Sequence, residues 1–201
     1  MMRRGKRERV QDKDFEKAVA CLKEGLPVVF PTDTVYGIGV SVRDASSPQA
    51  IYAIKKREAG KPVAWLVGGP EALDEFGEGV PDQAKELARA HWPGALTVIV
   101  AASAAVPDAF RAPNGTIGLR MPDSKTALAL IEAVGSPLAT SSANLSGGPD
   151  PRALSEVSDD LLGAVAAVVE DGEPRSGVAS TVIDCSQGCV RLVRQGGVIL
   201  D

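Results

Sequence analysis

Residues 55–61, KKREAGK, hold four lysine or arginine residues and a single acid. Lys55, Arg57 and Lys61 could bind the phosphates of a nucleotide, because cationic donors form strong hydrogen bonds with phosphate oxygens. The same cations follow an expected helix, and positive charge at a helix C-terminus is favourable without any ligand. From this stretch alone, a phosphate site and a solvated helix end are equally good interpretations.

The segment PLATSSANLSGG, residues 137–148, concentrates hydroxyl, amide and backbone N–H groups after an apolar run. Thr140, Ser142 and Asn144 could hydrogen-bond a ribose or a phosphate, since such loops bind anions without carrying charge themselves. The alternative is a turn rich in serine and asparagine that leads into the next helix. Taken alone, the segment favours this alternative.

Two arginines add weight to a binding site. Arg120 ends the apolar stretch TIGLR, and Arg194 ends VRLVR. A guanidinium at the end of a strand could offer two parallel donors to a carboxylate or a phosphate. Arginine at such a position is usually solvated, so this pattern is also weak by itself.

The stretch FPTDTVYGIG, residues 30–39, crowds polar groups behind an apolar run. Pro31 is expected to end the strand, because proline has no N–H for a sheet ladder. Burying Thr32, Asp33 and Thr34 without partners would cost roughly 1 to 3 kcal/mol each. The stretch therefore predicts a sheet edge or a cleft in which some side chains can meet a polar ligand.

Several common kinds of site are disfavoured. The sequence contains neither G-x-x-x-x-G-K-[ST] nor G-x-S-x-G, and Gly37 and Gly39 lack the third glycine of a dinucleotide fingerprint. One histidine, His91, gives little basis for a Ser-His triad, and with Cys185 and Cys189 it makes a poor zinc ligand set. If the protein binds phosphate, it uses another type of loop.

Composition sets wider limits. The 201 residues carry a net charge of −4 and are 44% hydrophobic, so the chain as a whole is no polycation for coating nucleic acid. No apolar run approaches the roughly 20 residues of a membrane span, and the basic start lacks the apolar region of a secretory signal. Three cysteines fit reduced thiols better than a disulfide framework. We therefore expect a cytoplasmic protein without membrane contact.

Apolar periodicity predicts helices interleaved with strands. Helices are expected near 12–24, 48–58, 81–91, 124–134 and 153–162, and strands near 26–30, 38–42, 62–67, 95–102, 116–120, 137–140, 166–170, 180–185 and 190–195. Interleaved elements favour an α/β sheet, and the short link between the last two strands favours a hairpin. The fold class is thus α/β with a twisted mixed parallel and antiparallel sheet.

No linker-like segment divides the chain. We expect a basic, flexible N-terminal tail over residues 1–11, and one domain over residues 12–201 whose first helix is capped by Asp12 or Asp14. The tail is expected to be solvated rather than a binding element.

Seven segments, in order, carry a resemblance to a known family. PTDTVYGIG, IYAIKKREAGKPV, HWPGALTVIV, GTIGLRMP, PLATSSANLSG, STVIDC and VRLVRQGGV are similar to segments of the YrdC-like family of threonylcarbamoyl-AMP synthases. Each motif alone is weakly specific, but seven motifs in the same order are strong evidence of homology. The resemblance implies a single α/β domain of the YrdC-like fold around a basic cavity, here in its short, single-domain bacterial form.

The family's reaction, as the resemblance implies, is nucleotidyl transfer. Threonine, bicarbonate or CO2, and ATP give threonylcarbamoyl-AMP and pyrophosphate, with Mg²⁺ accompanying ATP as the cofactor. A threonylcarbamoyl-transferase complex then modifies tRNA. Such chemistry needs cations and alignment rather than a covalent nucleophile.

The resemblance also implies site residues. Lys55 and Arg57 are the expected catalytic residues, and the expected ATP-binding set is Lys55, Arg57, Lys61, Thr116, Ser142, Asn144 and Arg194. The expected threonine-binding set is Thr34, Arg120, Thr140 and Ser180, with Arg120 binding the carboxylate. Mg²⁺ is expected on the ATP phosphates, and Asp33 either orients its loop or helps to hold the ion.

Two departures from the family pattern and two competing functions remain. Ala95 stands where the family more often has proline, and Lys56 where it often has glycine. The main alternative is a YrdC-like module that binds double-stranded RNA or tRNA, or acts in translation, without synthase activity. A paralogue that makes another carbamoyl or acyl adenylate is the other alternative.

Overall fold

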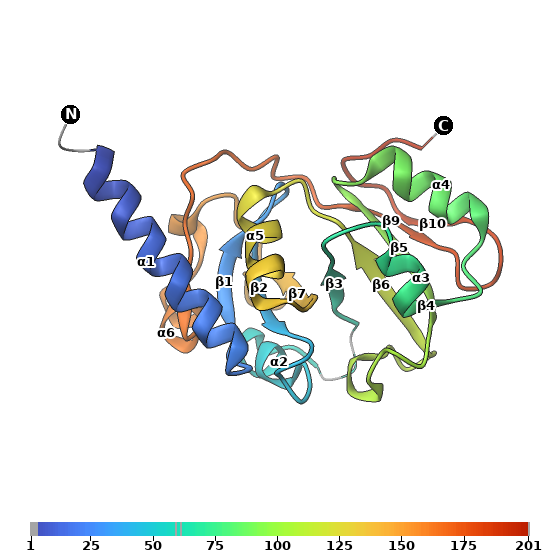
Figure 1. Ribbon diagram of the computed structural model, residues 1–201, viewed down its shortest axis with the longest axis horizontal. Coiled ribbons are helices and arrows are strands. Elements are labelled where there is room, and N and C mark those ends of the chain that lie inside the picture. Colours follow the sequence, from blue (N-terminus) through green and yellow to red (C-terminus); the bar gives the residue numbers. More distant parts are fainter. Residues whose placement is uncertain (1–3, 59, 61, 201) are drawn as a thin grey trace.

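Strands from the whole length of the chain pair into one sheet (Figure 1). The computed structural model describes residues 4–58, 60 and 62–200, with side chains from residue 12 onward. Its strands are β1 (Val28–Pro31), β2 (Tyr36–Ser41), β3 (Ala64–Leu66), β4 (Gly77–Glu78), β5 (Leu96–Ala102), β6 (Thr116–Arg120), β7 (Leu138–Ser142), β8 (Ala167–Val168), β9 (Thr181–Asp184) and β10 (Arg191–Arg194).

The sheet is mixed, as the sequence predicts. Its order is β10-β9-β5-β6-β3-β7-β2-β1-β8, and β4 pairs with β5. The pairs β1/β8, β3/β6 and β5/β9 are parallel, while β9/β10 is the predicted antiparallel hairpin. The prediction of a single α/β domain with a mixed sheet is confirmed.

Helices cover the sheet in separate groups (Figure 1). They are α1 (Arg4–Lys23), α2 (Gln49–Lys55), α3 (Ala72–Phe76), α4 (Asp82–His91), α5 (Lys125–Val134) and α6 (Asp159–Ala164). Helices α1 and α5 pack together beside β1, whereas α3 and α4 lie over β6 and β5. Among the described residues, no helix is long and apolar enough to cross a membrane.

Strand β1 shows why a wholly apolar run lies at this place in the sheet. Val28 and Phe30 pack in one hydrophobic cluster with Leu22 and Leu130 of α1 and α5, while Val29 belongs to the cluster on the other face. Because side chains alternate between the faces of a strand, a strand covered on both sides must be apolar at every position.

Two glycines let β2 lie close to β7. A Cβ on Gly39 would come within 3.0 Å of the Thr140 side chain and the Phe30 ring, and one on Gly37 within 2.9 Å of Thr140. The register places Gly37 opposite Ser142 and Gly39 opposite Thr140. This close packing brings the two polar segments predicted from the sequence, residues 30–39 and 137–148, side by side.

Some sequence predictions of element bounds are wrong. The first helix begins at Arg4, ahead of its expected caps, although the division into a tail and a domain at residue 12 stays a prediction. The helix near 153–162 is a 3-10 turn, Leu154–Glu156, followed by α6, because Ser158 caps a new helix by accepting from the Leu161 N–H. Elements α3 and β4 were not predicted, since neither exceeds five residues.

Pro31 ends its strand, as the sequence predicts. It pairs with Tyr36 at the end of β1. Proline is tolerated because Tyr36 finds its partners elsewhere: its N–H donates to the Pro151 carbonyl at 2.8 Å, and its carbonyl accepts from the Ala143 N–H at 2.8 Å. No ladder bond from Pro31 is required.

Candidate functional site

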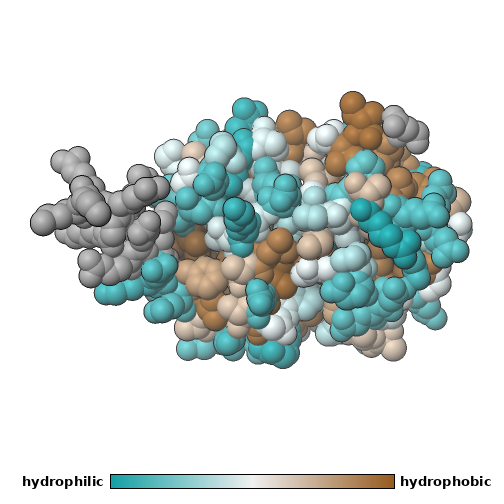
Figure 2. All heavy atoms as spheres, turned by 45° about the horizontal axis from the view of Figure 1, so that its top comes forward, coloured by the Kyte–Doolittle hydropathy of each residue, from teal (hydrophilic) through white to brown (hydrophobic). Residues whose placement is uncertain are grey.

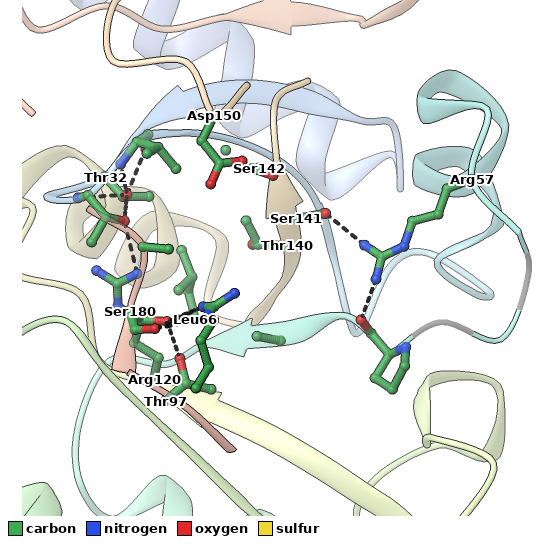
Figure 3. Close-up of a pocket in the computed structure, with 17 residues that line it drawn as sticks. Thr32, Arg57, Leu66, Thr97, Arg120, Thr140, Ser141, Ser142, Asp150 and Ser180 are labelled. Carbon is green, nitrogen blue, oxygen red and sulfur yellow. Dashed lines mark hydrogen bonds between the residues drawn. The ribbon is translucent and has the colours of Figure 1, made fainter. Parts of the chain in front are cut away.

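A cavity of about 280 Å³ opens where the two polar segments, residues 30–39 and 137–148, meet (Figure 3). Its walls come from the turn after β1, from β2, β3, β5, β6, β7 and β10, and from the segments around residues 57, 150 and 180. The lining residues are Thr32, Thr34, Val35, Gly37, Arg57, Pro62, Ala64, Leu66, Thr97, Arg120, Thr140, Ser141, Ser142, Asp150, Ala179, Ser180 and Arg194.

Arg120 ends β6 and lies buried in the cavity wall. Its Nε donates to the Gly94 carbonyl at 3.0 Å, one terminal nitrogen donates to Thr34 Oγ1 at 3.1 Å, and the other pairs with the Asp33 carboxylate. Burial lowers the pKa of Arg120, while the Asp33 charge raises it. Because a guanidinium stays protonated in proteins, the wall keeps a positive charge that is held in one orientation.

The turn from Thr32 to Val35 satisfies its own polar groups. Thr32 Oγ1 donates to the Val35 carbonyl at 2.7 Å and lies 3.0 Å from Thr34 Oγ1. The N–H groups of Ser176 and Gly177 reach the carbonyls of Asp33 and Thr34 at 3.1 and 2.9 Å. Thr32 and Thr34 are therefore buried without an unpaired hydroxyl, in the cleft that the sequence predicts.

Arg57 reaches the cavity because α2 stops at Lys55. Lys56 adopts a left-handed conformation with φ of 50°, a position where glycine is common, which explains the family's preference noted above. The guanidinium of Arg57 then donates to Ser141 Oγ at 3.0 Å and to the Pro62 carbonyl at 3.1 Å (Figure 3). A cation thus lies against the hydroxyl-rich end of β7.

Lys55 lies behind the cavity rather than in its wall. Its buried ammonium donates to the carbonyls of Ser142 and Asn144, the latter at 2.6 Å, and to Asn144 Oδ1 at 3.1 Å. Burial, and after it the nearby charge of Arg57, lower the pKa of Lys55 to about 8, while the charge of Asp150 acts in the opposite direction. The ammonium donates to the last residue of β7 and to the loop that follows it, so contact with phosphate stays a prediction.

Ser142 and Asn144 form a linked pair at that loop. Ser142 Oγ donates to Asn144 Oδ1 at 2.6 Å, and the Asn144 amide donates to the Gly148 carbonyl at 2.5 Å. Ser142 lines the cavity, whereas Asn144 does not. Asn144 therefore holds the loop that presents Ser142.

On the wall opposite Ser142, hydrogen bonds connect Arg194 to Ser180. Arg194 donates from two nitrogens to the Ser180 carbonyl at 3.1 and 2.9 Å, and from one of them to Ser180 Oγ at 3.2 Å. Ser180 Oγ also lies 2.8 Å from Thr97 Oγ1. This network fixes a third cation at the mouth of the cavity.

A second cavity, of about 320 Å³, adjoins the first, and the two share the lining residues Pro62, Ala64, Thr97, Ser180 and Arg194. Thr116 lies here, with its hydroxyl donating to Asn114 Oδ1 at 2.8 Å. Apolar side chains such as Phe110 and Val182 complete the lining. The pair of cavities offers one compartment rich in cations and hydroxyls and another that is more apolar.

The structure places the described site residues that the sequence predicts in four different settings. The first cavity is lined by Thr34, Arg57, Arg120, Thr140, Ser142, Ser180 and Arg194. Thr116 lies in the second cavity, Lys55 and Asn144 lie behind the loop, and Asp33 is engaged by Arg120. Lys61 lies outside the described residues.

Among the polar residues that line the first cavity, sequence reasoning did not assign Ser141, Thr97 and Asp150 to the site. Ser141 was inside a segment already singled out, so its neighbours could have indicated it. Thr97 interrupts an apolar strand, which is a faint signal. Asp150 follows the glycines of its loop, and nothing in the sequence around it indicated a place in the cavity.

The described residues contain no group of three or more His, Cys, Asp or Glu side chains that could hold a metal ion. All three cysteines are free.

Known proteins are similar to this chain in sequence and in fold. The Sua5_yciO_yrdC family model, described as "Telomere recombination", matches residues 20–196. This chain belongs to that family. The seven segments predicted membership of the YrdC-like family, and the match to the family model confirms it.

Two relatives of this Sua5/YciO/YrdC protein are named threonylcarbamoyl-AMP synthase. The one from Pyrococcus abyssi is 36% identical over 97% of this chain and 57% of its own length, and the one from Bacillus subtilis is 39% identical over 93% and 54%. The solved structure of P. abyssi Sua5 complexed with L-threonine has a TM-score of 0.86 at 36% identity, covering 93% of this chain and 55% of that one. The chain thus spans about half the length of these relatives.

Proposed function

We propose that this protein is a threonylcarbamoyl-AMP synthase, a nucleotidyltransferase that uses threonine, bicarbonate or CO2, and ATP. The observation that carries the proposal is one cavity in which two arginine sites, Arg120 and Arg57, lie on different walls and a third, Arg194, joins it to a second cavity. Two anions, an amino-acid carboxylate and a polyphosphate, could then be held at once. The names of the relatives support the same activity.

Arg120 is the proposed binding group for the threonine carboxylate. Of the five N–H groups of a guanidinium, its bonds to Gly94, Thr34 and Asp33 use three, so one N–H on each terminal nitrogen is left to donate to a ligand. Thr34, Thr140 and Ser180 supply hydroxyls in the same cavity. The complex of the P. abyssi relative with L-threonine is consistent with an amino-acid site in this fold.

ATP is proposed to occupy both cavities. The base and ribose suit the second, more apolar cavity near Thr116, and the phosphates suit Arg194, Ser142 and Arg57. Lys61 is a further proposed ATP ligand. Lys55 supports the phosphate site through the loop that carries Ser142, with direct contact to the triphosphate as the untested alternative.

The proposed reaction needs no covalent nucleophile from the protein. The threonine amine takes up CO2 and releases a proton, which gives a carbamate; a carbamate oxygen then attacks the α-phosphorus of ATP. One P–O bond forms, the P–O bond to pyrophosphate breaks, and pyrophosphate leaves. Fixed arginines and hydroxyls stabilise the charge that develops on the phosphoryl oxygens.

Mg²⁺ is the proposed cofactor, bound with ATP. It would neutralise charge on the phosphates when present. Asp33 is an unfavourable ligand, because its carboxylate is paired with Arg120 and lies on the threonine side of the cavity. We therefore assign Asp33 the other predicted role, in which it orients Arg120 and its loop.

The product would serve a downstream transfer. Threonylcarbamoyl-AMP is a mixed anhydride whose carbamoyl carbon is open to attack, so a threonylcarbamoyl-transferase complex acting on tRNA is the proposed partner. Direct contact with tRNA or double-stranded RNA and a cytoplasmic location remain predictions.

One assay tests the proposal. Purified protein is incubated with ATP, Mg²⁺, bicarbonate and threonine, and pyrophosphate is measured with and without threonine. We expect release that depends on threonine and is lost in Arg57→Ala, while the neighbouring Lys56→Ala retains it. A folded protein that binds RNA but releases no threonine-dependent pyrophosphate would contradict the proposal and favour the RNA-binding alternative.

A further inference from the structure

Asp150 is the one carboxylate among the described residues that line the first cavity. It lies with Ser142 on the opposite side of the cavity from Arg120 and Thr97 (Figure 3). All other charged lining residues, Arg57, Arg120 and Arg194, are cations. The Asp150 charge also acts on the nearby Lys55 ammonium, but no ion pair joins these two described residues, so a negative group in a cavity lined by cations needs a further chemical reason.

The position of Asp150 is fixed by its neighbours. Pro149 and Pro151 flank it, and proline restricts the backbone on both sides. Pro151 is buried, and its carbonyl accepts the Tyr36 N–H at 2.8 Å. The carboxylate is therefore carried by an anchored backbone, although the residue itself is exposed to the cavity and solvent.

The Asp150 carboxylate also has spare bonding capacity. Within the described part of the chain, no hydrogen bond or ion pair engages it, in contrast to Asp33, which pairs with Arg120. An ionised carboxylate has about four acceptor positions. These oxygens are available to a ligand on the side of the cavity where Ser142 lies.

We propose that Asp150 is a protein ligand of the Mg²⁺ ion that arrives with ATP. Facing bare phosphates, the carboxylate would only repel them, whereas a bridging cation converts the repulsion into binding. Mg²⁺ typically binds one or two carboxylates plus substrate phosphates and keeps several waters, so a single aspartate suffices. The inference rests on the proposed ATP site and adds the residue that makes this site metal-dependent.

The proposal predicts effects of opposite sign in one variant, Asp150→Asn. Equilibrium binding of ATP is measured by calorimetry, once with Mg²⁺ and once with excess EDTA. We expect at least about tenfold weaker binding with Mg²⁺, since a charge-assisted contact is lost, and tighter binding without metal, since a repulsion is removed. Asp160→Asn, an exposed aspartate on α6 outside both cavities, should change neither value.

A second readout observes the metal directly. Mn²⁺ replaces Mg²⁺, and the water-proton relaxation of Mn²⁺-ATP is followed on adding protein; the enhancement seen with the wild type should fall in Asp150→Asn. Changes of the same sign with and without metal would overturn the proposal, as would loss of threonine binding in Asp150→Asn, which would make the carboxylate a partner of the threonine ammonium. If the wild type binds no ATP under any condition, the proposed function itself fails. If the wild type and Asp150→Asn bind ATP equally well with and without Mg²⁺, only the proposed role of Asp150 is contradicted.

Discussion

At the scale of single residues, the cations near this site divide into three that line the cavity and one that holds the chain at the end of β7. Arg57, Arg120 and Arg194 line the cavity, while Lys55 is buried and donates to oxygens of Ser142 and Asn144. A lysine can serve this role because its three N–H groups rotate freely, whereas a guanidinium is planar and rigid.

Lys55→Met should therefore act through the loop. Methionine keeps most of the unbranched lysine side chain but leaves the Ser142 and Asn144 carbonyls without their donor, so we expect a loss of about 1 to 3 kcal/mol in the free energy of unfolding and weaker ATP binding. Denaturant unfolding and ATP titration measure both effects. Lys56→Met changes an exposed neighbour and serves as the matched control; equal behaviour of the two variants would contradict the role of Lys55.

The Lys55 ammonium also predicts a pH dependence. Burial lowers its pKa to about 8, so its positive charge is present below this pH and is lost as the pH rises through it. ATP affinity of the wild type should then fall between pH 7.5 and pH 9, while Lys55→Met should lack this step. A wild-type profile that stays flat over this range would rule out a contribution of the Lys55 charge to ATP binding.

Arg120 and Arg194 allow a matched comparison. Replacing either by lysine keeps the charge but removes the fork of donors. We expect Arg120→Lys to raise the KM for threonine by about 10-fold or more with a smaller effect on ATP, and Arg194→Lys to show the reverse order. Steady-state kinetics with each substrate varied provide the test, and equal effects of Arg120→Lys on both substrates would speak against its assigned role.

At the scale of elements, the site depends on how closely β2 approaches β7. Gly37 and Gly39 leave room for Thr140, and the register then pairs residues 138–142 with residues 37–41, so that the Ser142 end of β7 lies toward the turn that precedes β2. The short helix α2 contributes by stopping at Lys55, which turns Arg57 into the cavity.

Gly39→Ala should weaken this packing. Its new methyl group would lie 3.0 to 3.1 Å from Phe30, Thr140 and the Ala139 carbonyl, so we expect a destabilisation of about 1 to 3 kcal/mol. Gly163→Ala, in α6 with open space around it, should instead stabilise by up to about 1 kcal/mol. Urea unfolding of both variants distinguishes them, and a neutral Gly39→Ala would show that β2 and β7 can separate without cost.

At the scale of the whole molecule, binding depends on local rather than total charge. The protein carries a net charge of −4, yet three arginines converge on one cavity. Hydrophilic residues cover much of the face in Figure 2, with small hydrophobic groups between them, and the large hydrophobic side chains exposed among the described residues are Leu26, Val178, Leu192, Val193 and Ile199. The cavity joins both halves of the sheet, since Thr34 and Ser142 come from one and Arg120 and Ser180 from the other.

A ligand that spans both halves should stabilise the entire fold. ATP with Mg²⁺ at 100 times its dissociation constant should raise the free energy of unfolding by about 2.7 kcal/mol. Thermal unfolding monitored with increasing ATP measures the effect. Arg57→Ala should shift the response to higher ATP concentration, and an unchanged response would exclude Arg57 from the nucleotide site.

Much of this architecture could be predicted from the sequence, because periodicity and caps are local. The strands at β5, β6 and β9 and the helices α4 and α5 follow from apolar spacing, Ser124 and Gly135, and the order of the seven segments indicates the family. The polar residues Thr34, Arg120, Ser142 and Arg194 could be selected as candidates, since polar groups that follow apolar strands must be solvated or paired.

What the sequence could not determine is which of these groups share a wall and what each one faces. Lys55 and Arg57 are two positions apart, yet a left-handed Lys56 turns one behind the loop and the other into the cavity. Asp33 is held in an ion pair with Arg120, 87 positions away. Asp150 is held at the cavity because the neighbouring Pro151 carbonyl accepts a hydrogen bond from the Tyr36 N–H. These contacts are long-range, so only the tertiary structure decides them.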